Sequence, residues 1–271
     1  VMILLGLLAG IILARREASR LGEKTLEHVM NITALGAVMA LVGARLYHVV
    51  DQQNWPYYRS NPEQIFAVWN GGIGIYGATA GAILGVLVYA RWKKISMLRW
   101  LDIGAPAFLL GQAVGRWGNF FNQELFGLPS GMPWAIPIQE SSRPVQYQAF
   151  ERFHPLFIYE SILSLIGVAF LLYIARRFGA GGIEGESGVP RRWKLMPGDV
   201  LLLYFVWYPL ERFVLEFLRI QPWSAVGLPV AQWVSGFLAL AAIAILVWRH
   251  VRIGSSGWGS SGDPSAQHRS R

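Results

Sequence analysis

The sequence lacks cysteine altogether and has few charged residues for its length. Of its 271 residues only 15% are Asp, Glu, Lys or Arg, whereas soluble domains average about 25%. The absence of cysteine excludes a disulfide scaffold and a Cys-ligated metal site. The hydrophobic share of 54% excludes an intrinsically disordered chain. Two features are abundant instead: apolar sequence, and basic residues that give a net charge of +8.

The apolar residues form long blocks instead of amphipathic stripes. A membrane-spanning helix needs roughly 20 apolar residues, and every block but the first approaches or exceeds that length. We therefore predict an all-α polytopic membrane protein with seven transmembrane helices. Because the first block is short and the chain begins with Val1 instead of Met, we expect a longer natural N-terminus. The predicted spans are residues 1–14, 29–50, 65–90, 100–117, 155–175, 200–217 and 230–248.

Most of the basic residues lie in alternate loops, within 15–24, 91–99, 176–194 and 249–271. The positive-inside rule then places the N-terminus outside and the C-terminus in the cytoplasm. The net charge is explained by topology and by contact with membrane lipids, so no nucleic-acid partner is expected.

The longest outer segment, about 119–154, is rich in Pro and Gly and predicts a small extracytoplasmic cap. Residues 251–271 are predicted to be a disordered cytoplasmic tail.

Four arginines remain at membrane depth on the outer side. Each costs roughly 2.5–3.5 kcal/mol on insertion scales, which makes intramembrane charges candidates for function. A single such arginine could equally be snorkelling or paired for packing. Four on the same side favour a functional site. They are Arg45, Arg116, Arg212 and Arg219.

The densest polar motif is GRWGNFFNQELFG at residues 115–127. Arg116 supplies a planar fork suited to a phosphate. Asn119 and Asn122 can donate to ester or phosphate oxygens, or merely cap a helix end. Glu124 can orient Arg116, and Gly127 allows close backbone approach. We expect this motif to bind substrate.

A second motif places Tyr208, Arg212, Glu216 and Arg219 at i, i+4, i+8 and i+11. That spacing puts all four on one face of a single helix. The pattern can be a structural ion-pair ladder, which would be the favoured explanation in water. At the outer end of a membrane helix its one surplus positive charge favours binding an anionic headgroup.

Two further motifs are weaker. The run at 70–81 opens the third predicted helix with many glycines, which fit close helix packing, but Tyr76 among them needs a polar partner. His154 precedes Pro155 and is expected at the outer mouth of the fifth helix. No HExxH or other His/Asp cluster occurs, so we expect no metal and no cofactor.

The sequence resembles the phosphatidylglycerol–prolipoprotein diacylglyceryl transferase family. The motifs that carry the resemblance are GRWGNFFNQELFG, GARLY, NGGIGIYG, HPLFIYE and the Tyr208–Arg219 spacing. The resemblance implies an enzyme of the bacterial plasma membrane that acts in lipoprotein biosynthesis. It would move the sn-1,2-diacylglyceryl group of phosphatidylglycerol onto the lipobox cysteine thiol of a preprolipoprotein. The products would be a thioether and glycerol phosphate, and residues 1–250 would form the transferase domain.

By the same resemblance, Arg116, Arg212, Tyr208 and Tyr76 occupy catalytic positions. Substrate-binding roles are implied for Arg116 and for Asn119, Asn122, Glu124, Gly127, Arg45, His154, Glu216 and Arg219. Within this scheme we expect Arg116 and Arg212 to bind the phosphate. Glu216 and Glu124 would hold the guanidinium groups of these arginines in place. Many family members have histidine, a proposed base, where this chain has Tyr76. Tyrosine is a weak base at neutral pH, so three alternatives remain open: Tyr76 is an activated phenolate, another group takes the proton, or the thiol arrives ionised. Among them we favour a substrate-orienting role for Tyr76.

Two other kinds of protein are weighed against this prediction. A metal-dependent phosphatidyltransferase would need several membrane aspartates, and only Asp51, Asp102 and Asp199 lie near the membrane. The alternative function is a membrane anion or lipid transporter that uses the arginine cluster as its binding site. A transporter predicts polar residues that continue into the cytoplasmic half, which is nearly wholly apolar in sequence. An inactive scaffold leaves the cost of the arginines unexplained.

Overall fold

The computed structural model describes residues 1–20, 22–51, 54–72, 74–179, 194–220, 224–225 and 227–256. Side chains at 23–25, 75–76, 224–225 and 253–256 also lie outside the description. The chain is mainly helical and divides into two compact units. The larger unit comprises Val1–Leu13 and Leu101–Arg271, and the smaller unit comprises Ala14–Trp100.

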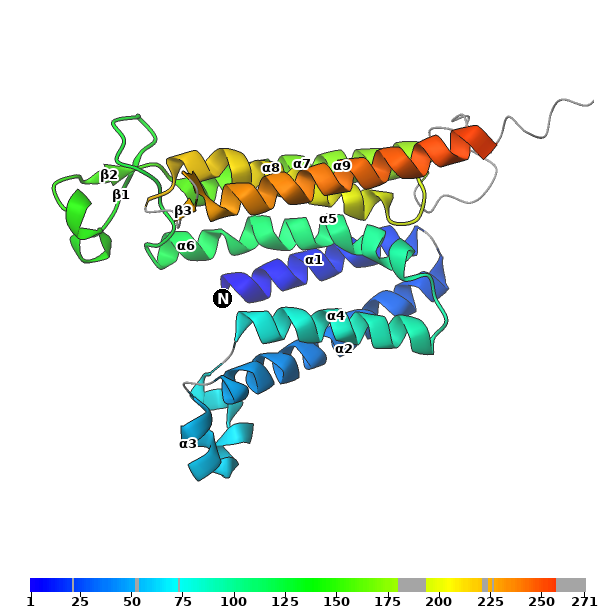
Figure 1. Ribbon diagram of the computed structural model, residues 1–271, viewed down its shortest axis with the longest axis horizontal. Helices are drawn as coiled ribbons and strands as arrows, with labels where there is room; N and C mark the ends of the chain where they lie inside the picture. The colour runs from blue at the N-terminus through cyan, green and yellow to red at the C-terminus, as the bar shows by residue number, and fades with distance from the viewer. Residues whose placement is uncertain are drawn as a thin grey trace, which may run out of the picture. The chain divides into compact units, whose positions relative to one another are not determined.

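Helices α7, α8 and α9 lie side by side in the larger unit (Figure 1). Its core is apolar and is built around Leu109, Leu171 and Val200, all fully buried. The helix α1 approaches α5 closely where Gly6 faces Gly111. The helices are α1 (Met2–Ser19), α5 (Met97–Gly115), α6 (Trp117–Phe121), α7 (Leu156–Phe178), α8 (Asp199–Leu215) and α9 (Val230–Ser256).

The cap of the larger unit lies between α6 and α7. Its strands β1 (Ile136–Pro137) and β2 (Arg152–Phe153) pair antiparallel, and two short 3-10 turns connect them, η3 (Glu140–Ser142) and η4 (Val145–Tyr147). Phe126, Ile138 and Phe153 form a small separate core. Beyond α8 come the 3-10 turn η6 (Glu216–Leu218) and an antiparallel pair, β3 (Ser224–Ala225) with β4 (Leu228–Pro229).

The smaller unit is an antiparallel helix pair, α2 (Glu23–Val50) and α4 (Ile75–Trp92). The two helices approach so closely that a Cβ on Gly77 would collide with the carbonyl oxygen of Gly43. This is the close packing that small residues permit in membrane helices. Between the helices lie α3 (Trp55–Ser60) and two 3-10 turns, η1 (Pro62–Phe66) and η2 (Val68–Asn70).

The third predicted span began too early. Residues 65–74 are apolar in part, but α4 begins only at Ile75. Gly71 and Gly72 have φ of 85° and 74°, which is left-handed backbone that cannot continue an α-helix. The 70–81 run therefore forms a loop before it becomes a helix.

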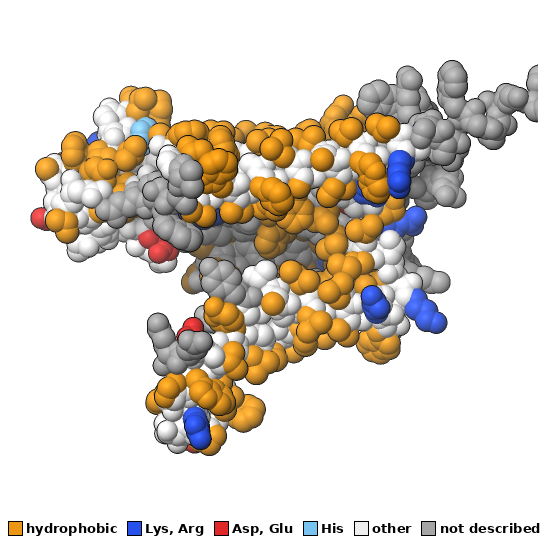
Figure 2. Space-filling view, viewed as in Figure 1, with side chains coloured by type: hydrophobic (Ala, Val, Ile, Leu, Met, Phe, Trp, Pro, Cys, Tyr) orange, Lys and Arg blue, Asp and Glu red, His pale blue; other side chains and the backbone are white. Residues whose placement is uncertain are grey.

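Seven helices of the described chain have 17 or more residues, and they fall on the seven predicted blocks. By length and composition, three stretches of the described chain are long and apolar enough to cross a membrane: Leu26–Val50, Leu156–Phe178 and Val230–Arg252. Hydrophobic side chains cover the outside of α9 (Figure 2), where Phe237 is 71% exposed. Such exposure suits contact with lipid.

The predicted tail boundary at residue 251 differs from the structure. The helix α9 continues to Ser256, so its last turns include the first residues assigned to the tail. Residues 257–271 lie outside the described residues.

Candidate active site

Arg116 lies at the junction between α5 and α6. The helix α5 ends at Gly115, and Arg116 keeps helical backbone angles (φ −58°, ψ −27°) before α6 begins. Its Nε is 2.5 Å from Oε2 of Glu160 on α7, and Nη2 donates to the Tyr208 hydroxyl at 3.4 Å. Tyr208 is itself held by Tyr204, because their rings stack at 5.9 Å with planes 2° apart.

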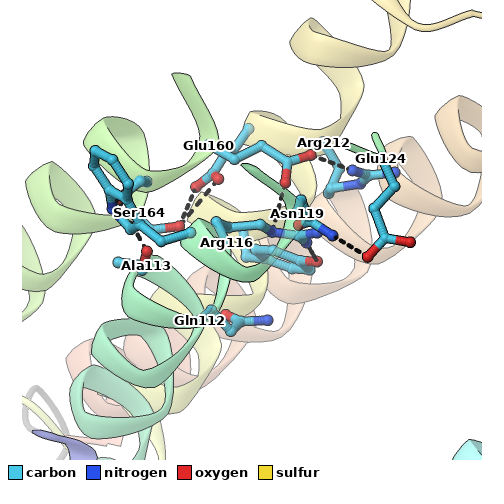
Figure 3. A network of polar contacts seen from close by, with 12 residues as sticks. Gln112, Ala113, Arg116, Asn119, Glu124, Glu160, Ser164 and Arg212 are labelled. Carbon is cyan, nitrogen blue, oxygen red and sulfur yellow. Dashed lines mark hydrogen bonds and ion pairs between the residues drawn. The ribbon is translucent and has the colours of Figure 1, made fainter. Parts of the chain in front are cut away.

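Glu160 joins Arg116 to Arg212. Nη1 of Arg212 is 2.5 Å from the other carboxylate oxygen of Glu160. One buried side chain therefore bridges the arginine at the α5–α6 junction and the arginine on α8 (Figure 3). Nη2 of Arg212 pairs with Glu216 at 3.2 Å, and Glu216 pairs with Arg219 at 3.3 Å. Together these five residues form an alternating row of arginine and glutamate, which we call the arginine row.

The helical face predicted for Tyr208 to Arg219 needs correction. The helix α8 ends at Leu215, Glu216 opens the 3-10 turn η6, and Arg219 is extended with ψ of 140°. Only Tyr208 and Arg212 therefore lie on the α-helix itself. The predicted ion pairs among Arg212, Glu216 and Arg219 are nevertheless present.

The arginine row carries three arginines and two glutamates. Glu211 adds a carboxylate on α8 that is also buried, but it accepts from the Ser164 hydroxyl at 3.0 and 3.2 Å and pairs with no arginine in the described chain. If Glu211 is ionised the group is neutral overall. Anion binding here must then depend on N–H donors aimed at the ligand more than on a surplus of charge.

Glu124 pairs with no arginine in the described residues, which corrects the role predicted for it. Its Oε1 accepts from the side-chain amides of Asn119 at 3.1 Å and Asn122 at 2.9 Å. These contacts fold the loop after α6, where Gln123 and Leu125 have φ of 51° and 53°. Left-handed backbone costs such residues on the order of 1 kcal/mol each, a strain often found at functional sites. Glu160, and not Glu124, holds the guanidinium groups of the arginines in place.

Gly127 lets the cap pack against the end of α8. Its N–H donates to the His154 carbonyl at 2.8 Å, and the next N–H, from Leu128, donates to Leu218 at 2.8 Å. A Cβ on Gly127 would lie 2.8 Å from the Leu218 oxygen and 2.9 Å from the His154 Cβ. Any larger residue would push the cap away from the arginine row.

His154 belongs to the same junction. Its Nδ1 lies 3.1 Å from the Tyr159 hydroxyl, which also accepts from Nε1 of Trp134 at 2.7 Å. These contacts tie the start of α7 to the cap. His154 is thus placed beside the site by side-chain and backbone bonds alike.

A cavity of about 330 Å³ opens between the cap and the ends of α7 and α8. Arg212 and Arg219 line it, together with Glu124, Glu160 and Glu216. Arg116 reaches the cavity wall through Glu160. The apolar part of the lining is Leu125, Phe126, Pro144, Leu156, Leu215 and Ile220.

Arg45 lies in the smaller unit and is 6% exposed. It donates to the carbonyls of Gln64, Ile65, Gly71 and Gly72, at 2.5 to 3.1 Å, and holds the loop that precedes α4. These bonds account for its burial, and its role in substrate binding stays a prediction. The backbone of Tyr76 is in the first turn of α4, but its side chain lies outside the described residues.

Sequence reasoning underrated two acidic residues, Glu160 and Glu211. Both are buried, at 4% and 5% exposure, and both lie within predicted spans. The rule that singled out the arginines, the cost of charge at membrane depth, applies equally to these glutamates. The cost of burying these two carboxylates was therefore the signal in the sequence that could have identified them.

The family model for prolipoprotein diacylglyceryl transferase matches residues 1–248, nearly the whole chain and every residue of the arginine row. The chain belongs to this family. Prolipoprotein diacylglyceryl transferases are bacterial membrane proteins, in agreement with the apolar helices of this chain.

Curated relatives agree with the family match. A phosphatidylglycerol–prolipoprotein diacylglyceryl transferase of Chloroflexus aggregans is 38% identical over 92% of this chain and 83% of its own length. One of Streptococcus equi subsp. zooepidemicus is 36% identical over 94% of the chain and 92% of its own length. One of Synechocystis sp. is 39% identical over 79% of this chain and 71% of its own length.

Proposed function

We propose that this protein transfers the diacylglyceryl group of phosphatidylglycerol to the cysteine thiol of a preprolipoprotein lipobox. The observation that carries the proposal is the bridge through Glu160. It fixes Arg116, at the junction of α5 and α6, beside Arg212 of α8, at a cavity of headgroup size. Family membership supports the same reaction.

The reaction breaks one bond and forms one. The substrate sulfur bonds to the glyceryl carbon, the bond from that carbon to the phosphate oxygen breaks, and glycerol phosphate leaves with the electron pair. The thiol proton leaves as the new bond forms, and the departing glycerol phosphate, which gains one negative charge, can take it up, so that atoms and charge balance. A phosphate monoester departs readily only if its growing charge is stabilised, and fixed guanidinium donors in a dry site supply that stabilisation.

Each residue of the site has a place in this scheme. Arg116 and Arg212 bind the phosphate, and Glu160 holds their guanidinium groups at a fixed separation. Tyr208 orients Arg116 through its hydroxyl. Arg219 lies at the more exposed end of the row, with its side chain 33% exposed. Tyr76 is assigned to orienting the substrate, as the sequence predicts.

The finer topology belongs to the same proposal. We assign seven spans to the seven long helices, with the cap outside and the C-terminus in the cytoplasm, in a multi-pass plasma-membrane protein. In the larger unit, basic residues end both α7 (Arg176, Arg177) and α9 (Arg249, Arg252) at the end opposite the cap. That distribution obeys the positive-inside rule. Because the family match spans both units, residues 1–250 are assigned to one transferase domain.

The test is transfer of labelled phosphatidylglycerol to a lipobox peptide by the purified full chain in detergent. Arg116→Ala and Arg212→Ala should each abolish transfer while the helical content and elution volume stay normal. Arg152→Ala, an exposed arginine of the cap, is the matched control and should transfer normally. A Cys→Ser peptide gives the blank. Near-normal transfer by folded Arg116→Ala or Arg212→Ala would contradict the assignment.

A further inference from the structure

Glu124 differs from the other carboxylates of the cavity. Glu160 and Glu216 are both paired with arginine, whereas Glu124 has no arginine partner in the described chain. Two asparagine amides hold its Oε1, and its Oε2 accepts no hydrogen bond from the described residues. Figure 3 shows this carboxylate with one oxygen bonded to Asn119 and the other turned away.

The surroundings of Glu124 indicate what this oxygen is for. The amide pair fixes its direction, and the strained backbone at Gln123 and Leu125 fixes the loop that carries it. A carboxylate oxygen only accepts hydrogen bonds, so it repels a phosphate and attracts a donor. The cavity therefore combines two kinds of surface, phosphate-binding donors on Arg212 and Arg219 and one oriented acceptor on Glu124.

The lipid headgroup supplies groups of both kinds. Phosphatidylglycerol carries a phosphodiester and, three carbons away at most, two free hydroxyls. A cavity of about 330 Å³ is large enough to hold the phosphate against the arginines and the glycerol beyond it. A hydroxyl that donates to an ionised carboxylate makes one of the stronger classes of hydrogen bond.

We propose that Glu124 is a specificity-determining residue, whose free oxygen accepts a hydrogen bond from a hydroxyl of the leaving glycerol group. This inference rests on the proposed function and adds to it the means by which the lipid is chosen. Glu124 is exposed at the rim of the cavity, and a lipid that lacks the hydroxyl forfeits the charge-assisted hydrogen bond that phosphatidylglycerol makes there.

The experiment compares two lipids with identical acyl chains, phosphatidylglycerol and phosphatidyl-n-propanol, which has the same three carbons and no hydroxyl. The purified full chain in detergent transfers the diacylglyceryl group of each to a lipobox peptide, and kcat/KM is measured for both. Wild type should prefer phosphatidylglycerol by about 10-fold, the worth of one hydrogen bond to a charged group. In Glu124→Gln that preference should fall to near one, through loss of kcat/KM for phosphatidylglycerol alone.

The controls separate specificity from structure. Glu151→Gln, an exposed carboxylate of the cap, should keep the wild-type preference. Glu124→Asp keeps the charge, so it should retain part of the preference. If Glu124→Gln lowers kcat/KM equally for both lipids, Glu124 only supports the loop and the proposal is overturned.

Wild type alone also tests the proposal, even where a variant does not fold. A wild-type preference near one overturns the role of Glu124 while leaving the transferase function intact. Failure of wild type to transfer from either lipid overturns the proposed function instead.

Discussion

Two clusters of charged residues in the larger unit can be compared directly, because they are built from the same kinds of side chain. The arginine row lies beneath the cap, and a second cluster lies where α8 begins and α9 ends. There Asp199 is fully buried, 2.8 Å from Arg249 Nη1 and 2.8 Å from His250 Nε2, and it accepts from the Met196 N–H at 2.7 Å. Both clusters join side chains that lie tens of residues apart in the sequence.

The difference between them lies in what the hydrogen-bond donors face. Asp199 and its neighbour Asp102 bind backbone N–H groups at the start of α8, and Asp102 accepts from Gly198 at 2.7 Å and Leu201 at 3.0 Å. Acidic groups at a helix N-terminus stabilise the helix. In the arginine row, guanidinium donors face a cavity instead. The second cluster therefore has the contacts of a structural clasp, and the first those of a binding site.

The layer between the clusters bears on the transporter alternative. Within the described part of the larger unit, the apolar core of Ala105, Leu109, Val168 and Leu171 separates them. A transport path for an anion needs polar groups across the membrane depth. An apolar layer of this kind is unfavourable for such a path within the larger unit, which favours chemistry at one side of the membrane.

The largest expected effect separates the clusters by function. Arg212→Ala should lower kcat/KM for lipid transfer by about 10²- to 10³-fold, because a transition-state donor is lost. Arg249→Ala, the equivalent change at the clasp, should leave kcat/KM within about 3-fold, since no reacting group is near it. Initial-rate assays on both variants decide the matter. Equal losses would mean that the clasp also takes part in catalysis.

The second effect concerns the bridge. Glu160→Gln should lower kcat by about 10- to 100-fold, because the two guanidinium groups lose their fixed separation. In combination with Arg212→Lys its effect should be less than the product of the single effects, since both changes disrupt one contact. A double-mutant cycle on kcat measures this. Full multiplicativity would show that Glu160 does not act through Arg212.

A smaller effect is expected at the exposed end of the row. Within the described residues Arg219 makes one ion pair, at 3.3 Å, and its side chain is 33% exposed. Arg219→Ala should raise KM for phosphatidylglycerol by about 2- to 5-fold with kcat nearly unchanged, as is usual for a partly exposed charge. Titration of the lipid in mixed micelles gives both constants. A large loss of kcat would move Arg219 into the catalytic group.

The smallest effect on activity should accompany a clear effect on stability. Asp199→Asn removes the buried charge that Arg249 and His250 share, which should destabilise the fold by on the order of 2 kcal/mol. Thermal unfolding in detergent should show a lower Tm, while transfer at low temperature stays within about 2-fold of wild type. An unchanged Tm would remove the clasp from the energetics of the bundle.

Much of the fold could be predicted because the spans depend on local composition. The cost of exposing backbone and charge in lipid acts residue by residue, so apolar blocks and basic loops locate the helices. The start of α4 was missed because Gly71 and Gly72 override apolar neighbours through backbone geometry. The end of α8 was missed because Glu216 continues the ion-pair ladder on a 3-10 turn.

The candidate site was predictable in its residue types and less so in its pairings. Arg116, Arg212 and Glu216 were singled out by sequence, and they are brought together. Glu124 was assigned to the arginines because it is close to Arg116 in sequence, yet the loop turns it toward Asn119 and Asn122. Short separation in sequence is weak evidence for a contact once the backbone leaves the helix.

The sequence by itself determined the class of protein, the long helices and the presence of arginines where charge is costly. Those properties follow from the solvation of each residue and need no partner. Only the tertiary structure decided that Glu160 joins Arg116 to Arg212 and that two asparagine amides orient the carboxylate of Glu124. Such pairings depend on where α5, α7 and α8 bring side chains separated by tens of residues, and no local pattern encodes that distance.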